Sequence, residues 1–254
     1  MFREKGWEMK PILFSDEMVR SILDGRKTQT RRPVKPQPKT LICDNEEKTI
    51  VSIIPPSSEC PFGQVGDRLW VKETFCLENQ VEGDQPPPFN DGRPTLYLMD
   101  GIECAKEDAE IWIQPHYRAT DPTPELSYED TDGEPTVKWK PSIHMPRWAS
   151  RITLEIVDVR IERVQGITEE EAIEEGAREF PDLPSIYPYD QDPRWSMEDP
   201  KTTLACLGSP RWAFANLWEK MYVKKGLRWH ENPWVWVITF KKEGINDKRR
   251  IERN

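Results

Sequence analysis

The longest β-strand pattern in the sequence changes phase in its middle. Between residues 151 and 161 the apolar positions are even-numbered up to Ile156 and odd-numbered from Val157 onward, so the predicted inward face shifts by one residue. Such a shift is typical of a β-bulge, and small closed barrels need strands that bend sharply. We therefore predict an α+β, mainly β fold: a β-barrel with flanking short helices and long loop insertions.

Other strands and helices follow from shorter patterns. Strands are predicted at residues 10–14, 66–75 and 234–240, with weaker ones at 95–99, 111–113 and 137–139. Helices are predicted after Ser15, at the Thr168–Glu171 capping box and after Ser209.

Charge and proline content shape the domain prediction. The chain has 254 residues, 45 acidic and 36 basic, which excludes a uniformly basic surface for nucleic acid. The acidic, proline-rich stretch at about 78–134 is interpreted as a solvated insertion, with a second loop at about 181–208 and a polar tail at 243–254. Because the strands at 66–75 and 151–161 need partners from across the insertion, we predict one domain over residues 1–254.

The cysteines and the absence of long apolar runs indicate in which compartment we expect the protein. The five cysteines have no C-x-x-C spacing, and no apolar run approaches 18 residues. We expect a cytoplasmic protein with free thiols, no membrane partner, no cofactor and no metal site. The sequence leaves the oligomeric state open.

One segment concentrates basic charge. Residues 20–39 contain a single acid, Asp24, and the basic residues Arg20, Arg26, Lys27, Arg31, Arg32, Lys35 and Lys39. Around Thr28 and Thr30 these cations form the mixture of cations and hydroxyls typical of a phosphate or nucleotide site. A solvated loop whose cations complement a helix C-terminus explains the same composition, so both interpretations stay open.

The motifs together resemble a known family. GRKTQTRR at 25–32, GDRLWVKE at 66–73, ITEEEAIEEG at 167–176 and a closing aromatic strand resemble the ASCH family, which has a PUA-like β-barrel and is linked to RNA and nucleoside handling. The block WKPSIHMPRWASR at 139–151 is similar to long ASCH proteins of bacteriophages and prophages. The resemblance covers about half of the chain and leaves out residues 78–134 and 181–200.

The resemblance also implies a catalytic set. Small family members are amidohydrolases of N4-acetylcytidine that use a lysine, a threonine and a glutamate, which by motif fall on Lys27, Thr30 and Glu175. This chemistry requires a base that activates the hydroxyl, and a lysine serves only when its pKa is depressed. Residues three apart point to opposite sides of a strand, so Lys27 and Thr30 cooperate only if the loop curls. Glu175 also belongs to a run of glutamates, for which a solvated helix face is the ordinary explanation.

Further candidates are substrate-binding or nucleic-acid-binding residues. They are Arg26, Arg31, Arg32, Glu73, His144, Arg147 and Trp148. Glu73 shares the inward face of Leu69 and Val71, so it is either a pocket carboxylate or the partner of an arginine. His144 is an acid/base candidate or a structural histidine, and Trp148 either stacks a base or belongs to the core.

Three functions therefore compete. The first is an enzyme that hydrolyses the acyl-amide of a modified cytosine nucleoside with Thr30, Lys27 and Glu175. The second is a non-catalytic RNA-binding module whose arginines grip phosphate, and the third is a phage accessory protein. Since phosphate binding requires no particular carboxylate, the combination of lysine, threonine and glutamate favours the enzyme.

Overall fold

The computed structural model describes residues 9–38, 40–41, 51–52, 59–81, 94–99, 102–103, 111–121, 138–183, 193–201 and 205–243. They form a mixed fold with more strand than helix, divided into two compact units. The first unit combines residues 1–20, 68–155 and 242–254, and the second combines 21–67 and 156–241. Each unit is therefore built from segments distant in the sequence.

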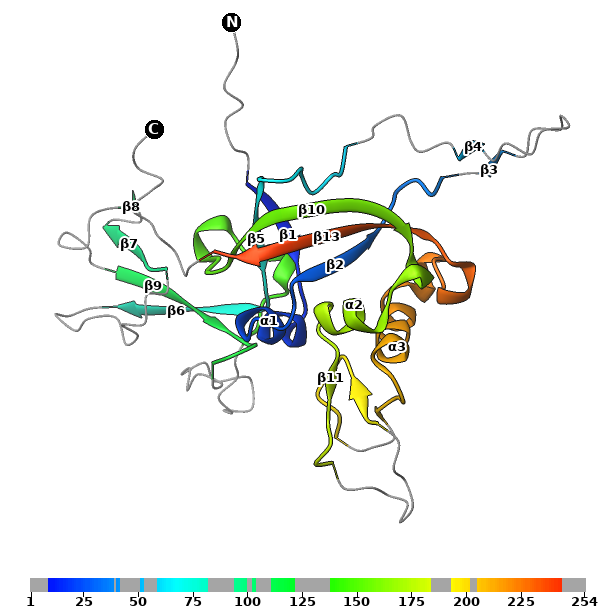
Figure 1. Cartoon of the computed structure of the whole chain (residues 1–254). Helices are drawn as coiled ribbons and strands as arrows, with labels where there is room; N and C mark the ends of the chain where they lie inside the picture. The colour runs from blue at the N-terminus through cyan, green and yellow to red at the C-terminus, as the bar shows by residue number, and fades with distance from the viewer. Residues whose placement is uncertain are drawn as a thin grey trace, which may run out of the picture. The chain divides into compact units, whose positions relative to one another are not determined.

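The first unit contains two groups of strands. β5 (Arg68–Lys72) pairs with β1 (Lys10–Leu13) in parallel and with the beginning of β10 (Thr153–Arg163) in antiparallel orientation. A four-stranded sheet has the order β6 (Phe75–Val81), β9 (Ile111–Tyr117), β7 (Leu96–Met99) and β8 (Ile102–Glu103), visible in Figure 1. The segment interpreted as an insertion thus carries a sheet of its own. Two short 3-10 helices follow, η2 (Ser142–His144) and η3 (Arg147–Ala149).

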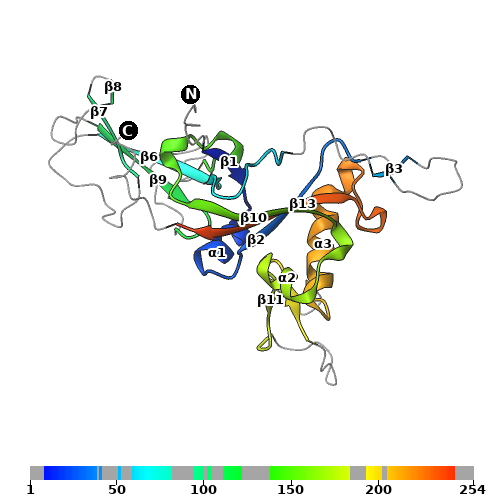
Figure 2. The same cartoon turned by 45° about the horizontal axis from the view of Figure 1, so that its top comes forward.

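The second unit contains the later part of β10 and the two strands that follow it in the same sheet. β2 (Gln29–Pro33) pairs antiparallel with β13 (Trp234–Lys242), and the two lie side by side in Figure 2. α2 (Glu169–Glu174) contacts α3 (Pro210–Tyr222). The remaining elements are β3 (Thr40–Leu41), β4 (Val51–Ser52), β11 (Arg178–Glu179), β12 (Trp195–Ser196), η4 (Val164–Gly166), η6 (Val223–Lys225) and η7 (Trp229–Glu231).

Several helix predictions are confirmed in atomic detail. α1 (Asp16–Leu23) begins after Ser15, which accepts a 3.4 Å hydrogen bond from the Met18 backbone, and it is followed by Gly25 at φ 77°. Thr168 and Glu171 form the predicted capping box of α2. Ser209 caps α3, whose residues Phe214, Leu217 and Trp218 are buried.

Several strands lie where the sequence predicts them, but they do not form the predicted barrel. β13 buries residues on both of its faces, as its sequence predicts. The predicted strand at 137–139 lies partly outside the described residues, and Lys138 and Trp139 form no strand. Of the predicted tail at 243–254, only Glu243 is described.

The closed barrel is a wrong prediction. The sheets within the described ranges are open, and β1 and β2 are edge strands with one hydrogen-bonded neighbour each. The predicted change of face in β10 is also not found, because Leu154 and Ile156 are buried but Val157 is 40% exposed. The odd-numbered apolar residues therefore do not continue the buried face, and the phase change carries no evidence for closure.

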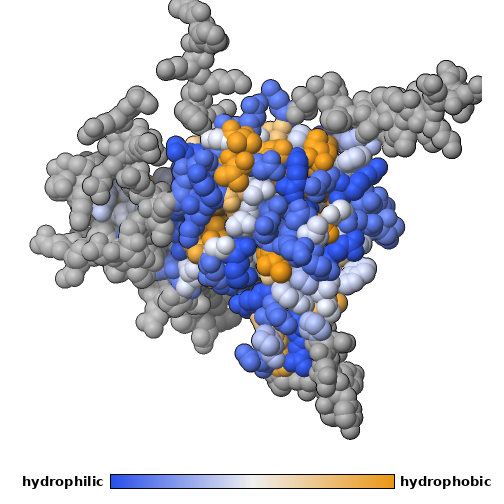
Figure 3. All heavy atoms as spheres, viewed as in Figure 1, coloured by the Kyte–Doolittle hydropathy of each residue, from blue (hydrophilic) through white to orange (hydrophobic). Residues whose placement is uncertain are grey.

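The surface is largely polar where it can be seen. Figure 3 shows hydrophobic residues in separate patches on a mainly hydrophilic face. Ile143 and Trp212 are large apolar side chains that are exposed, at 59% and 54%. Within the described ranges, no helix combines the length and apolar character needed to cross a membrane.

Candidate functional site

A chain reversal after α1 places Lys27 inside the second unit. The backbone N–H groups of Arg26 and Lys27 donate to the Ser21 carbonyl at 3.0 and 2.9 Å, which closes the helix end. The Thr28 N–H then donates to the Glu174 carbonyl at 2.9 Å, so the reversed segment is tied to the end of α2. Because both segments are fixed by backbone bonds, the side chains at 27 and 175 meet.

Gly176 allows the close approach of these segments. It follows Glu175 at φ 113°, a conformation that favours glycine. A Cβ at this position would lie 3.3 Å from both Cβ and Oγ of Ser21. Any larger residue would therefore strain the turn and push against the helix end that leads to Lys27.

Lys27 and Glu175 form a buried ion pair. The Lys27 Nζ donates to Glu175 Oε2 and to the Glu175 carbonyl at 2.7 Å, and to the Gln29 carbonyl at 2.8 Å. Each residue is 2% exposed. Three acceptors match the three N–H groups of an ammonium, so the charged lysine is well hydrogen-bonded here.

Burial and charge act on Lys27 in opposite directions. Burial lowers the pKa of the Lys27 ammonium from its usual 10.5, and the Glu175 carboxylate opposes this by raising it. Arg32 and Arg31 add to the lowering because like charges disfavour the protonated form. The net effect is a lowered pKa of the Lys27 ammonium, because burial outweighs the charge of Glu175.

Arg31 extends the pair into a larger network. Its Nη2 donates to Glu171 Oε2 at 2.8 Å, and its Nη1 lies 3.5 Å from Glu175 Oε1. Arg160 also donates to Glu171 and to Glu162, and Glu162 Oε2 lies 3.5 Å from Arg31 Nη2. The Arg31 side chain has no exposed surface. The carboxylates of the network therefore compensate the charge of Arg31 inside the protein.

Within the described part of the chain, Glu175 Oε1 accepts no hydrogen bond although it is buried. The other carboxylate oxygen, Oε2, is already bonded to Lys27. Oε1, which lies 3.5 Å from Arg31 Nη1, is thus the atom of this pair that can accept a further hydrogen bond.

Thr30 lies on the other side of β2. Gln29 and Arg31 contact each other through a 2.6 Å hydrogen bond, and both face the glutamates of α2. Side chains alternate along a strand, so Thr30 projects from the opposite face, where it is buried at 1% exposure. The loop predicted at 24–32 is extended from Gln29 onward, which separates the Thr30 hydroxyl from the Lys27 amine.

The other two arginines of residues 24–32, Arg26 and Arg32, are only partly exposed. Arg26 is half-buried, donates to the Gly176 carbonyl at 3.3 Å and pairs with Asp24 at 3.1 Å. Arg32 is half-buried and lies opposite Trp236 in the pairing of β2 with β13. The segment is therefore an internally paired structure more than an open cationic surface.

Glu73 belongs to the first unit and is the partner of an arginine. Arg151 donates to its two carboxylate oxygens at 3.0 and 2.8 Å, in bidentate geometry. The guanidinium also lies 3.8 Å from the ring centre of Tyr117. Burial raises the pKa of Glu73, and the hydrogen bond and charge of Arg151 oppose the rise. Of the two interpretations of Glu73, the structure supports the ion-pair partner.

The three candidates from the 139–151 block also lie in the first unit. His144 is exposed on η2, and Trp148 packs against the buried cluster that includes Phe75 and Tyr117. Arg147 is half-buried, and its guanidinium lies 5.7 Å from the Trp70 ring. Burial lowers the pKa of Arg147.

Trp70 is contacted by a second cation. The Lys72 Nζ lies 5.3 Å from the Trp70 ring and donates to the Ile143 carbonyl at 2.5 Å. In the described ranges, neither Lys72 nor Arg147 has a carboxylate partner. Two cations that have no carboxylate partner among the described residues therefore share one aromatic ring in a protein whose net charge is −9.

Sequence reasoning missed Gln29, Arg160 and Glu162 as members of the Arg31 network. It identified Glu171 only as a capping residue, although its Oε2 accepts from both Arg31 and the Thr168 N–H. These residues are separated from Arg31 by up to 140 positions, and no local pattern signals the pairing. The alternation of charged residues in β10 was the available hint.

No protein-family model, curated protein or solved structure matches the chain. The functional argument therefore depends on the residues themselves and on the motif resemblance. Among the described residues, no three His, Cys, Asp or Glu side chains are grouped so that they could hold a metal ion.

Proposed function

We propose that the chain recognises a modified cytosine nucleoside, free or within RNA, and hydrolyses its N4-acyl amide in the cytoplasm. The observation that carries this proposal is the buried Lys27–Glu175 pair, with 2.7 Å between Nζ and Oε2. The ASCH motifs that imply the substrate, and the PUA-like relationship that accompanies them, belong to the same proposal.

The pair can supply both proton transfers that amide hydrolysis needs. When the Lys27 ammonium passes its proton to Glu175, the neutral amine can accept a proton from the attacking hydroxyl. The protonated Glu175 can then donate to the leaving N4 amine, and the acyl group departs as a carboxylic acid. Low polarity around the pair favours this exchange, because both partners are neutral after it.

In this proposal the attacking hydroxyl is that of water. The resemblance assigns it to Thr30, but Thr30 projects from the face of β2 opposite Arg31. Both members of the pair are 2% exposed, so the acyl group reaches them only when the surrounding segments open. This requirement makes the activity assay decisive between a catalytic and a purely stabilising pair.

The test measures the release of acetate from N4-acetylcytidine by liquid chromatography. The wild-type protein is compared with Glu175→Gln and Thr30→Ala, each first shown to be folded by circular dichroism. We expect turnover by the wild type, loss of at least about 100-fold in Glu175→Gln and near wild-type activity in Thr30→Ala. Folded wild-type protein that releases no acetate would eliminate the hydrolase, and a large loss in Thr30→Ala would return the nucleophile to threonine.

The structure favours the enzyme over phosphate binding by the 24–32 segment. Arg31 is fully buried and faces Glu171, Glu162 and Glu175, so its charge is already compensated. A phosphate-binding site requires cations that are accessible and whose charge is not already compensated by carboxylates.

A second candidate function, RNA binding without turnover, is supported by a different place in the first unit. Lys72 and Arg147 lie at Trp70 without carboxylate partners in the described ranges. We expect Lys72→Ala with Arg147→Ala to weaken RNA binding and to reduce its salt dependence. Arg178→Ala removes an exposed cation already paired with Asp199 and is the matched control. RNA affinity unchanged by the double variant would refute this function.

A further inference from the structure

A short connection in the second unit concentrates cations at the surface. Residues 223–233 join α3 to β13 and include the 3-10 helices η6 and η7, drawn in orange in Figure 1. Lys224, Lys225 and Arg228 are exposed on this α3–β13 connection, and its one acid is Glu231. The connection therefore carries a formal charge of +2 in a chain whose net charge is −9.

The three cations have no carboxylate partner among the described residues. The Lys225 Nζ lies 5.0 Å from the ring centre of Tyr222, and this attraction leaves its charge in place. The Glu231 carboxylate accepts a hydrogen bond from the Arg228 backbone N–H at 2.9 Å. Glu231 is thus used to close the turn of η7, and the ammonium groups of the connection stay available to an anion.

Arg163 adds a fourth cation against the same connection. It is the last residue of β10, donates to the Asn232 carbonyl at 2.9 Å and lies 4.3 Å from the ring centre of Trp234. In the described ranges it also has no carboxylate partner. The positive surface therefore extends from the connection to the end of the long strand.

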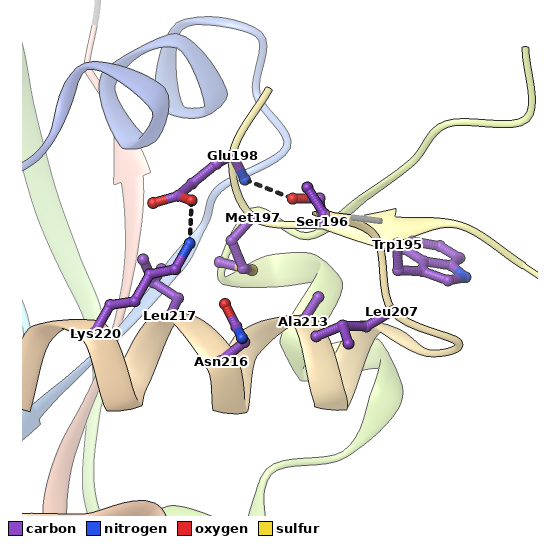
Figure 4. Close-up of a pocket in the computed structure, with 10 residues that line it drawn as sticks. Trp195, Ser196, Met197, Glu198, Leu207, Ala213, Asn216, Leu217 and Lys220 are labelled. Carbon is purple, nitrogen blue, oxygen red and sulfur yellow. Dashed lines mark hydrogen bonds and ion pairs between the residues drawn. The ribbon is translucent and has the colours of Figure 1, made fainter. Parts of the chain in front are cut away.

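Lys220 provides the comparison within the same region. It lies on the last turn of α3 and its side chain is 55% exposed. Figure 4 shows its ammonium directed at the Glu198 carboxylate, with 2.5 Å between Nζ and Oε2. Arg178 of β11 is likewise exposed and paired, with Asp199 at 2.5 Å. Exposed cations elsewhere in this unit thus have counter-charges that those of the connection lack.

The connection is held from beneath by buried aromatic residues. The Trp218 indole N–H donates to the Leu227 carbonyl at 2.8 Å, and the Trp229 N–H donates to Glu219 Oε1 at 2.7 Å. The Gln165 side-chain amide donates to the Trp229 carbonyl at 2.8 Å. Both tryptophans are buried. Because the backbone is fixed in this way, the cations are held in place before a ligand binds, which lowers the entropic cost of binding.

The composition of this surface suits a phosphate backbone more than a protein or a membrane. Lysine and arginine side chains contact phosphate oxygens in nucleic-acid complexes. None of the exposed large apolar side chains in the described ranges lies in the connection. Protein interfaces depend on aromatic or apolar anchors and are poor in lysine, and interfacial membrane helices insert apolar side chains. Cations without exposed apolar neighbours therefore favour a strand of phosphates.

We propose that the α3–β13 connection binds the phosphate backbone of single-stranded RNA. The identity of the nucleic acid rests on the proposed function, since a modified cytosine is accessible to an enzyme when it is unpaired in such a strand. The inference makes a polymer the substrate class, which the Lys27–Glu175 pair alone leaves open. The connection is distinct from the cations at Trp70, which belong to the first unit.

The test is fluorescence anisotropy of a fluorescein-labelled oligocytidine RNA, titrated with the full chain at a series of salt concentrations. Lys224→Ala with Lys225→Ala should reduce the slope of log affinity against log salt by about 1.4, since each phosphate contact of a single strand contributes about 0.7. Lys220→Ala with Arg178→Ala removes the same charge from paired positions and should leave the slope unchanged. Circular dichroism first confirms that each variant is folded.

Two results would overturn the proposal. One is an RNA affinity and salt slope that are the same in the Lys224→Ala, Lys225→Ala variant and in the wild type, or that change equally in the control variant. The other is binding of a polyglutamate peptide, or of phosphatidylserine vesicles, as tightly as RNA and through the same two lysines.

Acetate release separates this inference from the hydrolase itself. It is measured with free N4-acetylcytidine and with an oligoribonucleotide that contains N4-acetylcytidine. We expect the variant without Lys224 and Lys225 to have a raised KM for the oligoribonucleotide and unchanged turnover of the free nucleoside. If neither substrate releases acetate, the hydrolase fails, and salt-dependent RNA binding through the two lysines still supports the surface. An equal loss of activity on both substrates would contradict it.

Discussion

The buried pair gives the most quantitative prediction. Lys27→Met removes the ammonium and leaves the Glu175 carboxylate buried, with Arg31 Nη1 3.5 Å away as the nearest compensating group. Removing one partner of a buried ion pair costs about 3–5 kcal/mol, a large share of a typical unfolding free energy of about 5–15 kcal/mol. We expect Lys27→Met to lie in this range because both side chains are at least 97% buried, with 0% and 3% exposure.

The assay is urea unfolding of a double-mutant cycle with Lys27→Met, Glu175→Leu and the double variant. The double variant should be about 2 kcal/mol more stable than the sum of the single effects predicts, because it leaves no unpaired charge. Lys220→Met is the matched control, since its pair with Glu198 is exposed and should contribute less than about 1 kcal/mol. A cost for Lys27→Met no greater than that of the control, or strictly additive effects, would refute the buried pair.

Three further predictions test neighbouring features. Gly176→Ala should lower the free energy of unfolding by about 1–3 kcal/mol because of its φ of 113°. Gly208→Ala, with open space around its Cβ position, is the control and should change it by less than about 0.5 kcal/mol. Equal effects of the two variants in thermal unfolding would contradict the strained turn. Thr168→Ala should cost about 1 kcal/mol through loss of the α2 cap, and an unchanged urea midpoint would exclude the capping box. Burial raises the pKa of Glu73, so the folded state binds a proton at Glu73 more tightly than the unfolded state does. The unfolding free energy of the wild type, relative to that of Glu73→Gln, should therefore increase as the pH falls through the folded-state pKa toward 4.5. A difference between the two proteins that does not change with pH would contradict the shift.

Local signals in the sequence predicted local structure well. The hydroxyl caps at Ser15, Thr168 and Ser209 each begin a helix, because capping depends on residues three or four positions apart. The burial of Glu73, which directly follows β5, was also expected from the sequence, and its need for a cation is met by Arg151. These features involve short-range geometry that a sequence displays directly.

The barrel and the catalytic trio depended on long-range geometry. The phase change in β10 predicted a bulge and closure, but Val157 is 40% exposed and the sheets are open. The meeting of Lys27 with Glu175, 148 positions apart, came from the family resemblance and is found in the structure. The same resemblance put Thr30 beside them, and strand alternation in β2 places it on the other face.

The most direct test of the central claim is an NMR titration of the Lys27 side chain, assigned with Lys27→Met. The buried pair predicts that Lys27 titrates with a pKa below its usual 10.5, and that Glu175→Gln lowers this pKa further because the carboxylate favours the ammonium. A Lys27 amine that titrates at or above 10.5, or that is unaffected by Glu175→Gln, would contradict the proton-sharing pair on which the proposed hydrolysis depends.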